Sequence, residues 1–212
     1  MSRQEERLWV PELREALLTQ FPAHLMPFKR YEEAIEVLNS PLATRHGLTA
    51  SMHYFLGGCH FMLQQYPLAI EHMNHALAKR AEPVHWPVVR EVLGVAPRHY
   101  IANSLVLLQR HDEAEAAFRR ALTDDPNHRV LRVDFARWLH SRDRSVEALT
   151  LLHESIRSDA TDVAAWELGA RIVTSKPDFI EVALDWTAEA ILHHPQHPAL
   201  LGARAEALLL AQ

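Results

Sequence analysis

A chain of 212 residues that is 48% hydrophobic and 23% charged, with only six glycines, has the composition of a helical globular protein and not of a disordered or sandwich-like one. Its length is enough to bury about 70% of the unfolded surface, so the fold requires no disulfide or metal. A net charge of −5 is unsuited to a general binder of the nucleic-acid backbone, which needs a basic stripe, and we expect no nucleic-acid partner.

The predicted elements are helical hairpins that follow one another along the chain. In the first and least regular hairpin, a helix over residues 11–21 pairs with one over 31–38. In the clearest hairpin, a helix over 97–109 is followed by one over 112–123, which ends before Pro126. The units span about residues 11–49, 50–83, 95–128, 129–161 and 162–197, and an atypical helix at 198–212 caps the array.

An insertion at residues 84–94 separates the second unit from the third. Pro87, followed by apolar residues at helical spacing, predicts a short extra helix that ends at Gly94. We interpret it as a variant connection that packs against the array. The alternative is a hook for a partner that uses Trp86.

One frame of small and bulky residues recurs in the second helices of the hairpins. Each copy has an alanine, a second residue four positions later and a small residue three positions beyond that. The alanines are 34 or 35 residues apart, or 45 where the insertion falls, so each unit buries its apolar face against its neighbours. Small side chains there let two helices approach within about 8–10 Å. The copies are Ala69, Met73 and Ala76; Ala114, Phe118 and Ala121; Ala148, Leu152 and Ser155; and Ala183, Thr187 and Ala190.

This frame resembles the tetratricopeptide repeat, whose pattern is W-x2-L-G-x2-Y, then A-x3-F, then P. Residues 95–127 match it best, through Ala114-x3-Phe118, Ala121 and Pro126. Further matches are Leu56-Gly57 in the second unit, where His60 stands at the tyrosine position, and Trp166, Ala183, Ala190 and Pro195 in the last. The resemblance implies an all-α fold: a right-handed superhelical α-solenoid of about five antiparallel helix pairs with a C-terminal capping helix, forming a single domain over residues 1–212.

The resemblance also implies a concave groove, lined by the first helix of each hairpin, that binds a peptide or protein. Family members that capture the C-terminal carboxylate of chaperones share a lysine and asparagine clamp, of which only Asn103 corresponds here, and we expect no such role. Arginines grip carboxylates bidentately, which favours an acidic extended peptide. The equal alternative is that Arg137 and Arg171 pair with nearby carboxylates such as Asp134. The candidate partner-binding residues are Tyr54, His99, Asn103, Arg137, His140, Glu167 and Arg171.

The sequence contains no motif of a reaction centre. It lacks a nucleophile elbow, a glycine-rich phosphate loop, a zinc-protease motif and paired cysteines. Cys59 precedes His60, but neighbours on a helix point in different directions, so we predict a buried structural cysteine. Trp138, Trp166 and Trp186 fit the apolar faces of their helices and are expected in the core. We therefore predict no catalytic residue, no cofactor and a non-enzymatic scaffold.

Three alternatives remain. The chain could be the repeat portion or a subunit of a larger enzyme or a secretion or assembly complex. Fifteen histidines also suggest a metal binder, with His72 and His75 at helical spacing, but His72 and His75 share their helix with the inward-facing frame residues and we predict no metal site. Lastly, the capping helix offers an apolar face for a homodimer, made of Leu200, Leu201, Leu208, Leu209 and Leu210.

Localisation follows from what the sequence lacks. No apolar run approaches the roughly eighteen residues that span a bilayer, and no signal-peptide pattern precedes the first predicted helix. The single cysteine, Cys59, forms no internal disulfide and needs no oxidising compartment. We expect a cytoplasmic protein without a membrane partner.

Overall fold

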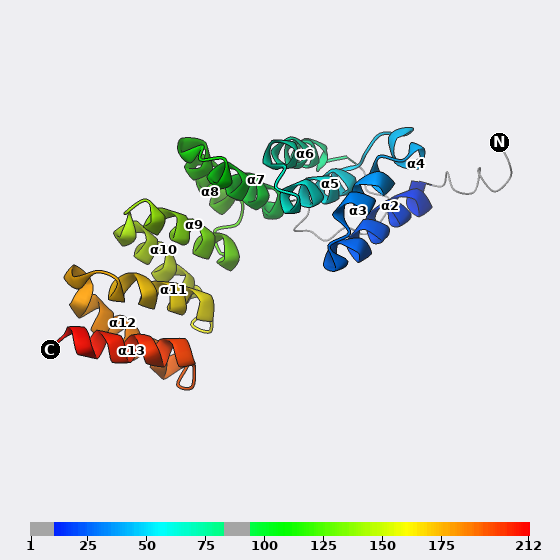
Figure 1. Ribbon diagram of the computed structural model, residues 1–212. Helices are drawn as coiled ribbons and strands as arrows, with labels where there is room; N and C mark the ends of the chain where they lie inside the picture. Colours follow the sequence, from blue (N-terminus) through cyan, green and yellow to red (C-terminus); the bar gives the residue numbers. More distant parts are fainter. Residues whose placement is uncertain (1–10, 83–93) are drawn as a thin grey trace. The chain divides into compact units, whose positions relative to one another are not determined.

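The computed structural model describes residues 11–82 and 94–212, and the helix expected after Pro87 lies outside them. The described residues form twelve α-helices and two short 3-10 helices, with no strand among them (Figure 1). The predicted all-α fold of five hairpins and a final helix is confirmed in this part of the chain. The contacts divide the chain into two compact units, Met1–Asp124 and Asp125–Gln212, which we call the N-terminal and C-terminal units.

The N-terminal unit contains three hairpins, in which α2 packs on α3, α5 on α6 and α7 on α8. Because α6 also packs on α7, the second and third hairpins are stacked. The helices are α2 (Pro11–Leu25), α3 (Tyr31–Leu38), α4 (Pro41–Thr44), α5 (Ala50–Met62), α6 (Tyr66–Lys79), α7 (Val95–Leu107) and α8 (His111–Asp124), and η1 (Met26–Phe28) joins α2 to α3.

The first hairpin differs from its prediction in two places. α2 continues through Pro22 for four residues beyond the expected end at Phe21, because Leu18 and Leu25 are both buried and hold its last turns. The short helix α4 was not expected from the residue pattern. Its end is fixed by the buried Arg14 of α2, which donates hydrogen bonds to the carbonyls of Leu42, Ala43 and Gly47 at 2.8, 2.5 and 2.6 Å.

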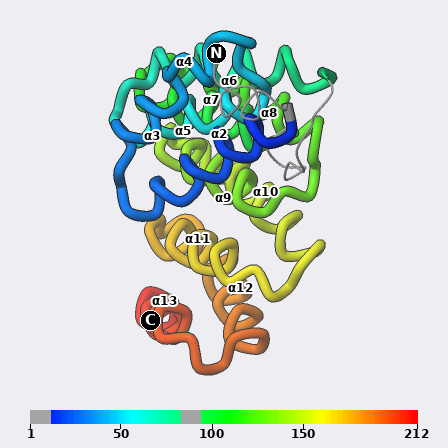
Figure 2. Tube along the Cα trace, turned by 90° about the vertical axis from the view of Figure 1, so that its right-hand side faces the viewer, coloured from blue at the N-terminus to red at the C-terminus, as the bar shows by residue number. Residues whose placement is uncertain are grey.

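The C-terminal unit contains two hairpins and the capping helix. Figure 2 shows α11, α12 and α13 side by side, and each of these helices contacts the other two. The one residue added to the turn of the second hairpin is accommodated by a 3-10 helix, η3 (Pro177–Phe179). The helices are α9 (Arg129–Ser141), α10 (Ser145–Ser158), α11 (Val163–Thr174), α12 (Ile180–His193) and α13 (Pro198–Leu210).

The recurring frame forms the contact surface inside each hairpin. All twelve of its residues are at most 1% exposed, from Ala69 on α6 to Ala190 on α12, so the prediction that they point inward is confirmed. The expected core positions of Trp138, Trp166 and Trp186 are also confirmed, since all three are buried. The small frame residues therefore let the two helices of a hairpin approach each other.

Four of the hairpin turns share one conformation. Lys29, Gln64, Gln109 and Asp143 are all left-handed, with φ between 59° and 62°, and the residue after each donates a backbone hydrogen bond across the turn. This is the usual way to end a helix, although glycine is the usual residue. In three turns an arginine pairs with a glutamate three residues later: Arg30 with Glu33, Arg110 with Glu113 and Arg144 with Glu147.

The capping helix α13 corrects one detail of the predicted apolar face. Leu200 is 1% exposed and packs inward with Ala207, because the same side of the helix covers the end of the array. The other four leucines of the expected face, Leu201, Leu208, Leu209 and Leu210, are exposed.

Candidate functional site

The candidate residues lie on the first helices of the hairpins at recurring positions. Asn103 is the ninth residue of α7, Arg137 the ninth of α9 and Arg171 the ninth of α11. The corresponding residue of α5 is Gly58, and that of α13 is Glu206. The neighbouring tenth positions of α9 and α11 are buried, whereas Arg137 and Arg171 are exposed, so in these two helices the ninth position faces away from the helix pair.

In the N-terminal unit, α5 and α7 lie side by side and share an aromatic cluster of Tyr54, Phe61 and Tyr100. The ring of Tyr100 meets Tyr54 edge-on at 5.9 Å and Phe61 at 5.2 Å, and its hydroxyl hydrogen-bonds with Tyr54. Burial is the main reason why the pKa of Tyr100 is raised, so the hydroxyl stays protonated. A side chain at Gly58 would stand 4.0 Å from this hydroxyl and closer to Met26, so glycine leaves the cluster room.

The two polar candidates of α7 contact each other. The amide of Asn103 lies 3.1 Å from Nε2 of His99, one helical turn away, and both residues are half-buried. The contact orients the amide group of Asn103 along the surface of α7, and one of its two N–H donors remains available.

In the C-terminal unit, α9 packs on α11, and each helix presents one exposed arginine. Arg137 forms an ion pair with Asp134, three residues earlier on α9, and its side chain is still 58% exposed. Arg171 has no ion pair or side-chain hydrogen bond with any residue of the described ranges. The two arginines therefore differ in how much of their charge a carboxylate already compensates.

The remaining candidates, His140 and Glu167, are engaged in local contacts. His140 lies in the last turn of α9, where its Nδ1 is 3.0 Å from the hydroxyl of Ser145, the first residue of α10. Glu167 lies 3.5 Å from Nε2 of His197, the residue before α13. The first contact ties α9 to α10, and the second ties α11 to the start of α13.

Comparison with known proteins assigns the fold. Residues 105–172 match the family model described as tetratricopeptide repeat. YrrB, described as a TPR protein with an unusual peptide-binding site, superposes with a TM-score of 0.61 at 20% identity, over 89% of this chain and 90% of its own. The chain therefore has the tetratricopeptide-repeat fold.

Two further solved structures have the same fold. The C-terminal part of a TPR repeat-containing protein from Cytophaga hutchinsonii gives a TM-score of 0.73 at 16% identity, over 91% of this chain and 71% of that one. A thermophilic TPR protein of Thermus thermophilus gives 0.59 at 16% identity, over 92% and 99%. No curated protein matches this chain in sequence. At these identities the likeness shows the fold.

The surface residues that sequence reasoning missed are Tyr100, Phe61 and Glu206. Tyr100 occupies the position after His99 and was not expected on the surface of α7. Its signal is the spacing of Tyr54 and Phe61 on α5, which places two aromatic residues on one face of the helix, two turns apart. Glu206 is identified by its register alone, since it is the ninth residue of its helix.

The potential reactive groups of the described residues are in unreactive surroundings. Cys59 is fully buried, as predicted, and burial together with Glu32 raises the pKa of its thiol to about 11. His72 and His75 lie beside His53, but the described residues contain no group of three or more histidine, cysteine, aspartate or glutamate side chains arranged to hold a metal ion. None of the described helices is long and apolar enough to cross a membrane.

Proposed function

We propose that this tetratricopeptide-repeat protein is a non-enzymatic scaffold that binds a protein or peptide on its first helices. The fold supports the proposal, because stacked helix pairs present extended surfaces suited to protein binding. YrrB, which shares the fold, is described as having a peptide-binding site. We also infer a cytoplasmic location.

Within this proposal, the partner is an extended acidic peptide that binds the C-terminal unit. The observation that carries it is the repeated placement of arginine: Arg137 and Arg171 are both exposed, at the same position of two helices that pack together. A guanidinium group can donate two parallel hydrogen bonds to one carboxylate, which gives both affinity and orientation. Because Arg171 forms no ion pair with a carboxylate of the described residues, it is the stronger of the two anchors.

The register also predicts where the acidic residues of the peptide bind along the C-terminal unit. Glu206 takes the place of arginine at the ninth position of α13, and it is exposed. An acidic residue of the peptide is therefore attracted at α9 and α11 and repelled at α13. In the N-terminal unit, Tyr54, His99 and Asn103 form a surface of aromatic and amide groups, and we propose that they contact apolar side chains and backbone carbonyls of a partner.

The test is a panel of fluorescein-labelled decapeptides of equal length and apolar content that differ in their number of aspartate and glutamate residues. We expect affinity, measured by fluorescence polarisation, to increase with the acidic content. Replacing Arg137 and Arg171 together by glutamate should weaken the tightest peptide at least tenfold, because two attractive contacts become repulsive. Glu206→Arg should strengthen it by extending the basic row.

The matched control carries the same change in charge elsewhere on the C-terminal unit. Arg142 lies in the turn after α9 and Arg157 on α10, and both are exposed. Their joint replacement by glutamate should change the affinity less than threefold, and circular dichroism should show unchanged helix content in every variant. Equal losses of affinity in the two double variants would show that net charge alone causes the effect. That result would contradict the proposed surface.

Two narrower hypotheses from the sequence stay predictions. Homodimerisation would use the exposed leucines of α13, of which Leu209 is 69% exposed. A role as the repeat portion or a subunit of a larger enzyme or a secretion or assembly complex would place the chemistry on another polypeptide or segment.

A further inference from the structure

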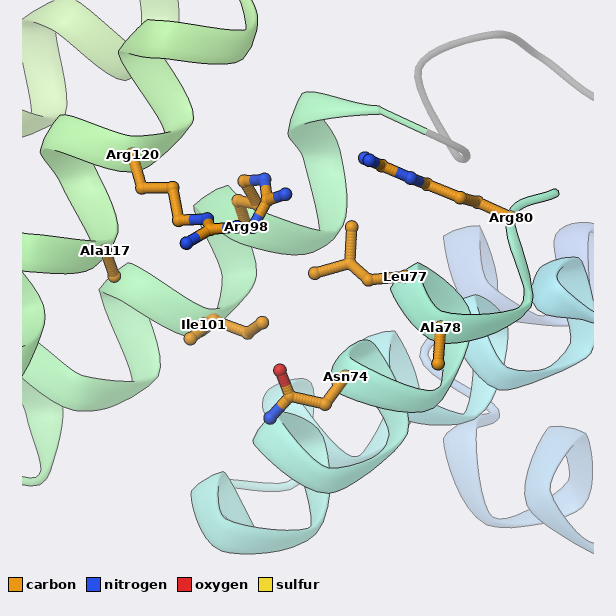
Figure 3. A pocket seen from close by; sticks show the side chains of 8 residues that line it. All are labelled: Asn74, Leu77, Ala78, Arg80, Arg98, Ile101, Ala117 and Arg120. Carbon is orange, nitrogen blue, oxygen red and sulfur yellow. The ribbon is translucent and has the colours of Figure 1, made fainter.

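A pocket of about 460 Å³ lies in the N-terminal unit, outside the first-helix surface of the proposed peptide site. It is formed by α6, α7 and α8, and Figure 3 shows Arg98 and Arg120 extending into the same space from α7 and α8. Arg80, at the end of α6, reaches toward them from the opposite side. The lining residues are Asn74, Leu77, Ala78, Arg80, Arg98, Ile101, Ala117 and Arg120. Its volume is within the range of small-molecule sites.

The charge around this arginine pocket is unbalanced. Asp124 forms an ion pair with Arg98 and lies 3.9 Å from Arg80, so one carboxylate is shared between two guanidinium groups. Arg120 has no ion pair or side-chain hydrogen bond with any residue described in the structure. Among the described residues, three positive charges of the pocket thus face one negative charge, which leaves two positive charges for a ligand.

The wall of the pocket between the arginines is apolar. Leu77 projects from α6 into the centre of the view and Ile101 from α7 below it, and Ala117 of α8 adds a methyl group. A small inorganic anion would leave this apolar surface exposed to water. An anion that carries a hydrocarbon or aromatic body would cover it and gain from burying apolar area.

We propose that the arginine pocket binds a small organic dianion, a phosphate monoester or a pair of adjacent carboxylates on an apolar body. The guanidinium groups of Arg98 and Arg120 hold the anionic group, since both phosphate and carboxylate accept their paired N–H donors. Leu77 and Ile101 contact the apolar body, and Arg80 closes the charged side. Asp124 competes with the ligand for Arg98.

Isothermal titration calorimetry on the full chain tests the site with four probes: phenyl phosphate, phthalate, inorganic phosphate and benzoate. We expect phenyl phosphate or phthalate, which combine two charges with a ring, to bind at least tenfold more tightly than inorganic phosphate or benzoate. The tighter of the first two identifies the anionic group. No binding of either at millimolar concentration would overturn the proposal, as would equal binding of all four.

Three variants locate the binding. Arg120→Gln should weaken the tighter probe at least fivefold, whereas Asp124→Asn should strengthen it, because the competing carboxylate is gone. The control is Arg119→Gln, the neighbouring arginine of α8, which pairs with Glu115 and does not line the pocket. An equal loss in Arg119→Gln and Arg120→Gln, or a weakening in Asp124→Asn, would contradict the site. Arg120→Gln should leave decapeptide binding unchanged. The pocket and the peptide site are therefore tested separately, and either proposal can be contradicted without the other.

Discussion

Replacing Gly169 by alanine is expected to destabilise the C-terminal unit by about 3 kcal/mol, although alanine is the better helix former. A methyl group added to Gly169 on α11 would stand 2.0 Å from Cζ2 and 2.3 Å from Cε2 of Trp186 on α12. The indole cannot move aside easily, since its N–H donates to the carbonyl of Trp166 at 3.2 Å and its ring meets Trp166 edge-on at 5.4 Å. Urea unfolding followed by circular dichroism measures the loss.

Gly202→Ala provides the matched control for this substitution. Gly202 lies on α13 of the same unit, and an added methyl group would have no atom within 4 Å. Without an opposing contact, the change should stabilise the unit by about 0.5–1 kcal/mol through helix propensity and chain entropy. In the Gly169→Ala background, Trp186→Leu should restore part of the lost stability by removing the clash. A Gly169→Ala chain as stable as Gly202→Ala would show that Trp186 does not pack on Gly169.

Acidification is expected to destabilise the N-terminal unit through His53, by on the order of 2 kcal/mol between pH 6.5 and 4. His53 on α5 is buried with Nδ1 3.1 Å from Nδ1 of His72 on α6, and its ring stacks on His75 at 4.9 Å. Burial, followed by the charges of His72, His75 and Lys79, lowers its pKa to about 4. Burial also lowers the pKa of His72, so two histidines resist protonation.

The direction of this effect follows from proton uptake. An unfolded histidine has a pKa near 6.5, so between pH 6.5 and 4 the unfolded chain binds a proton that the folded chain excludes at His53. Stability is therefore full above about pH 6.5 and decreases as the pH falls toward 4. Below that, the folded chain is protonated as well and His53 adds no further loss.

The measurement is the free energy of unfolding in urea at pH 7.5, 6.5, 5.5 and 4.5. Carboxylates also begin to titrate at the acidic end, so the informative quantity is the difference in slope between the chain and His53→Gln, which cannot be protonated. The variant should lose at least half of the acid-dependent destabilisation, even if its stability at pH 7.5 is lower. His24→Gln, which removes an exposed histidine of α2, should follow the unmodified chain. Parallel curves for all three chains would contradict the role of His53.

The repeat frame made the architecture predictable from the sequence, because burial at those sites depends only on residue size and spacing. Ala114, Phe118 and Ala121 are fully buried, as the equivalent residues of the other hairpins are. The same register contains a second signal. At the position of Phe135 in one hairpin the next has Gly169, and at the position of Leu151 it has Trp186, so a smaller residue on the first helix accompanies a larger one on the second.

The candidate site was less predictable, because the partners of a surface side chain depend on contacts between helices that spacing does not specify. Helical register correctly places Arg137 and Arg171 on the exposed side of their helices. It could not show that Arg137 pairs with Asp134 whereas Arg171 does not, nor that His140 contacts Ser145 at a turn. The arginine pocket could not be predicted from the sequence either, since its charged residues come from three helices and occupy no common repeat position.

Photo-crosslinking tests the peptide-binding account most directly. The tightest acidic decapeptide of the panel is made with p-benzoylphenylalanine beside an acidic residue, irradiated with the full chain, and the adducts are located by mass spectrometry. The account predicts adducts on α9 and α11 close to Arg137 and Arg171, and their loss when both arginines are replaced by glutamate. Adducts concentrated on the second helices α10 and α12, or unchanged in the double variant, would contradict it.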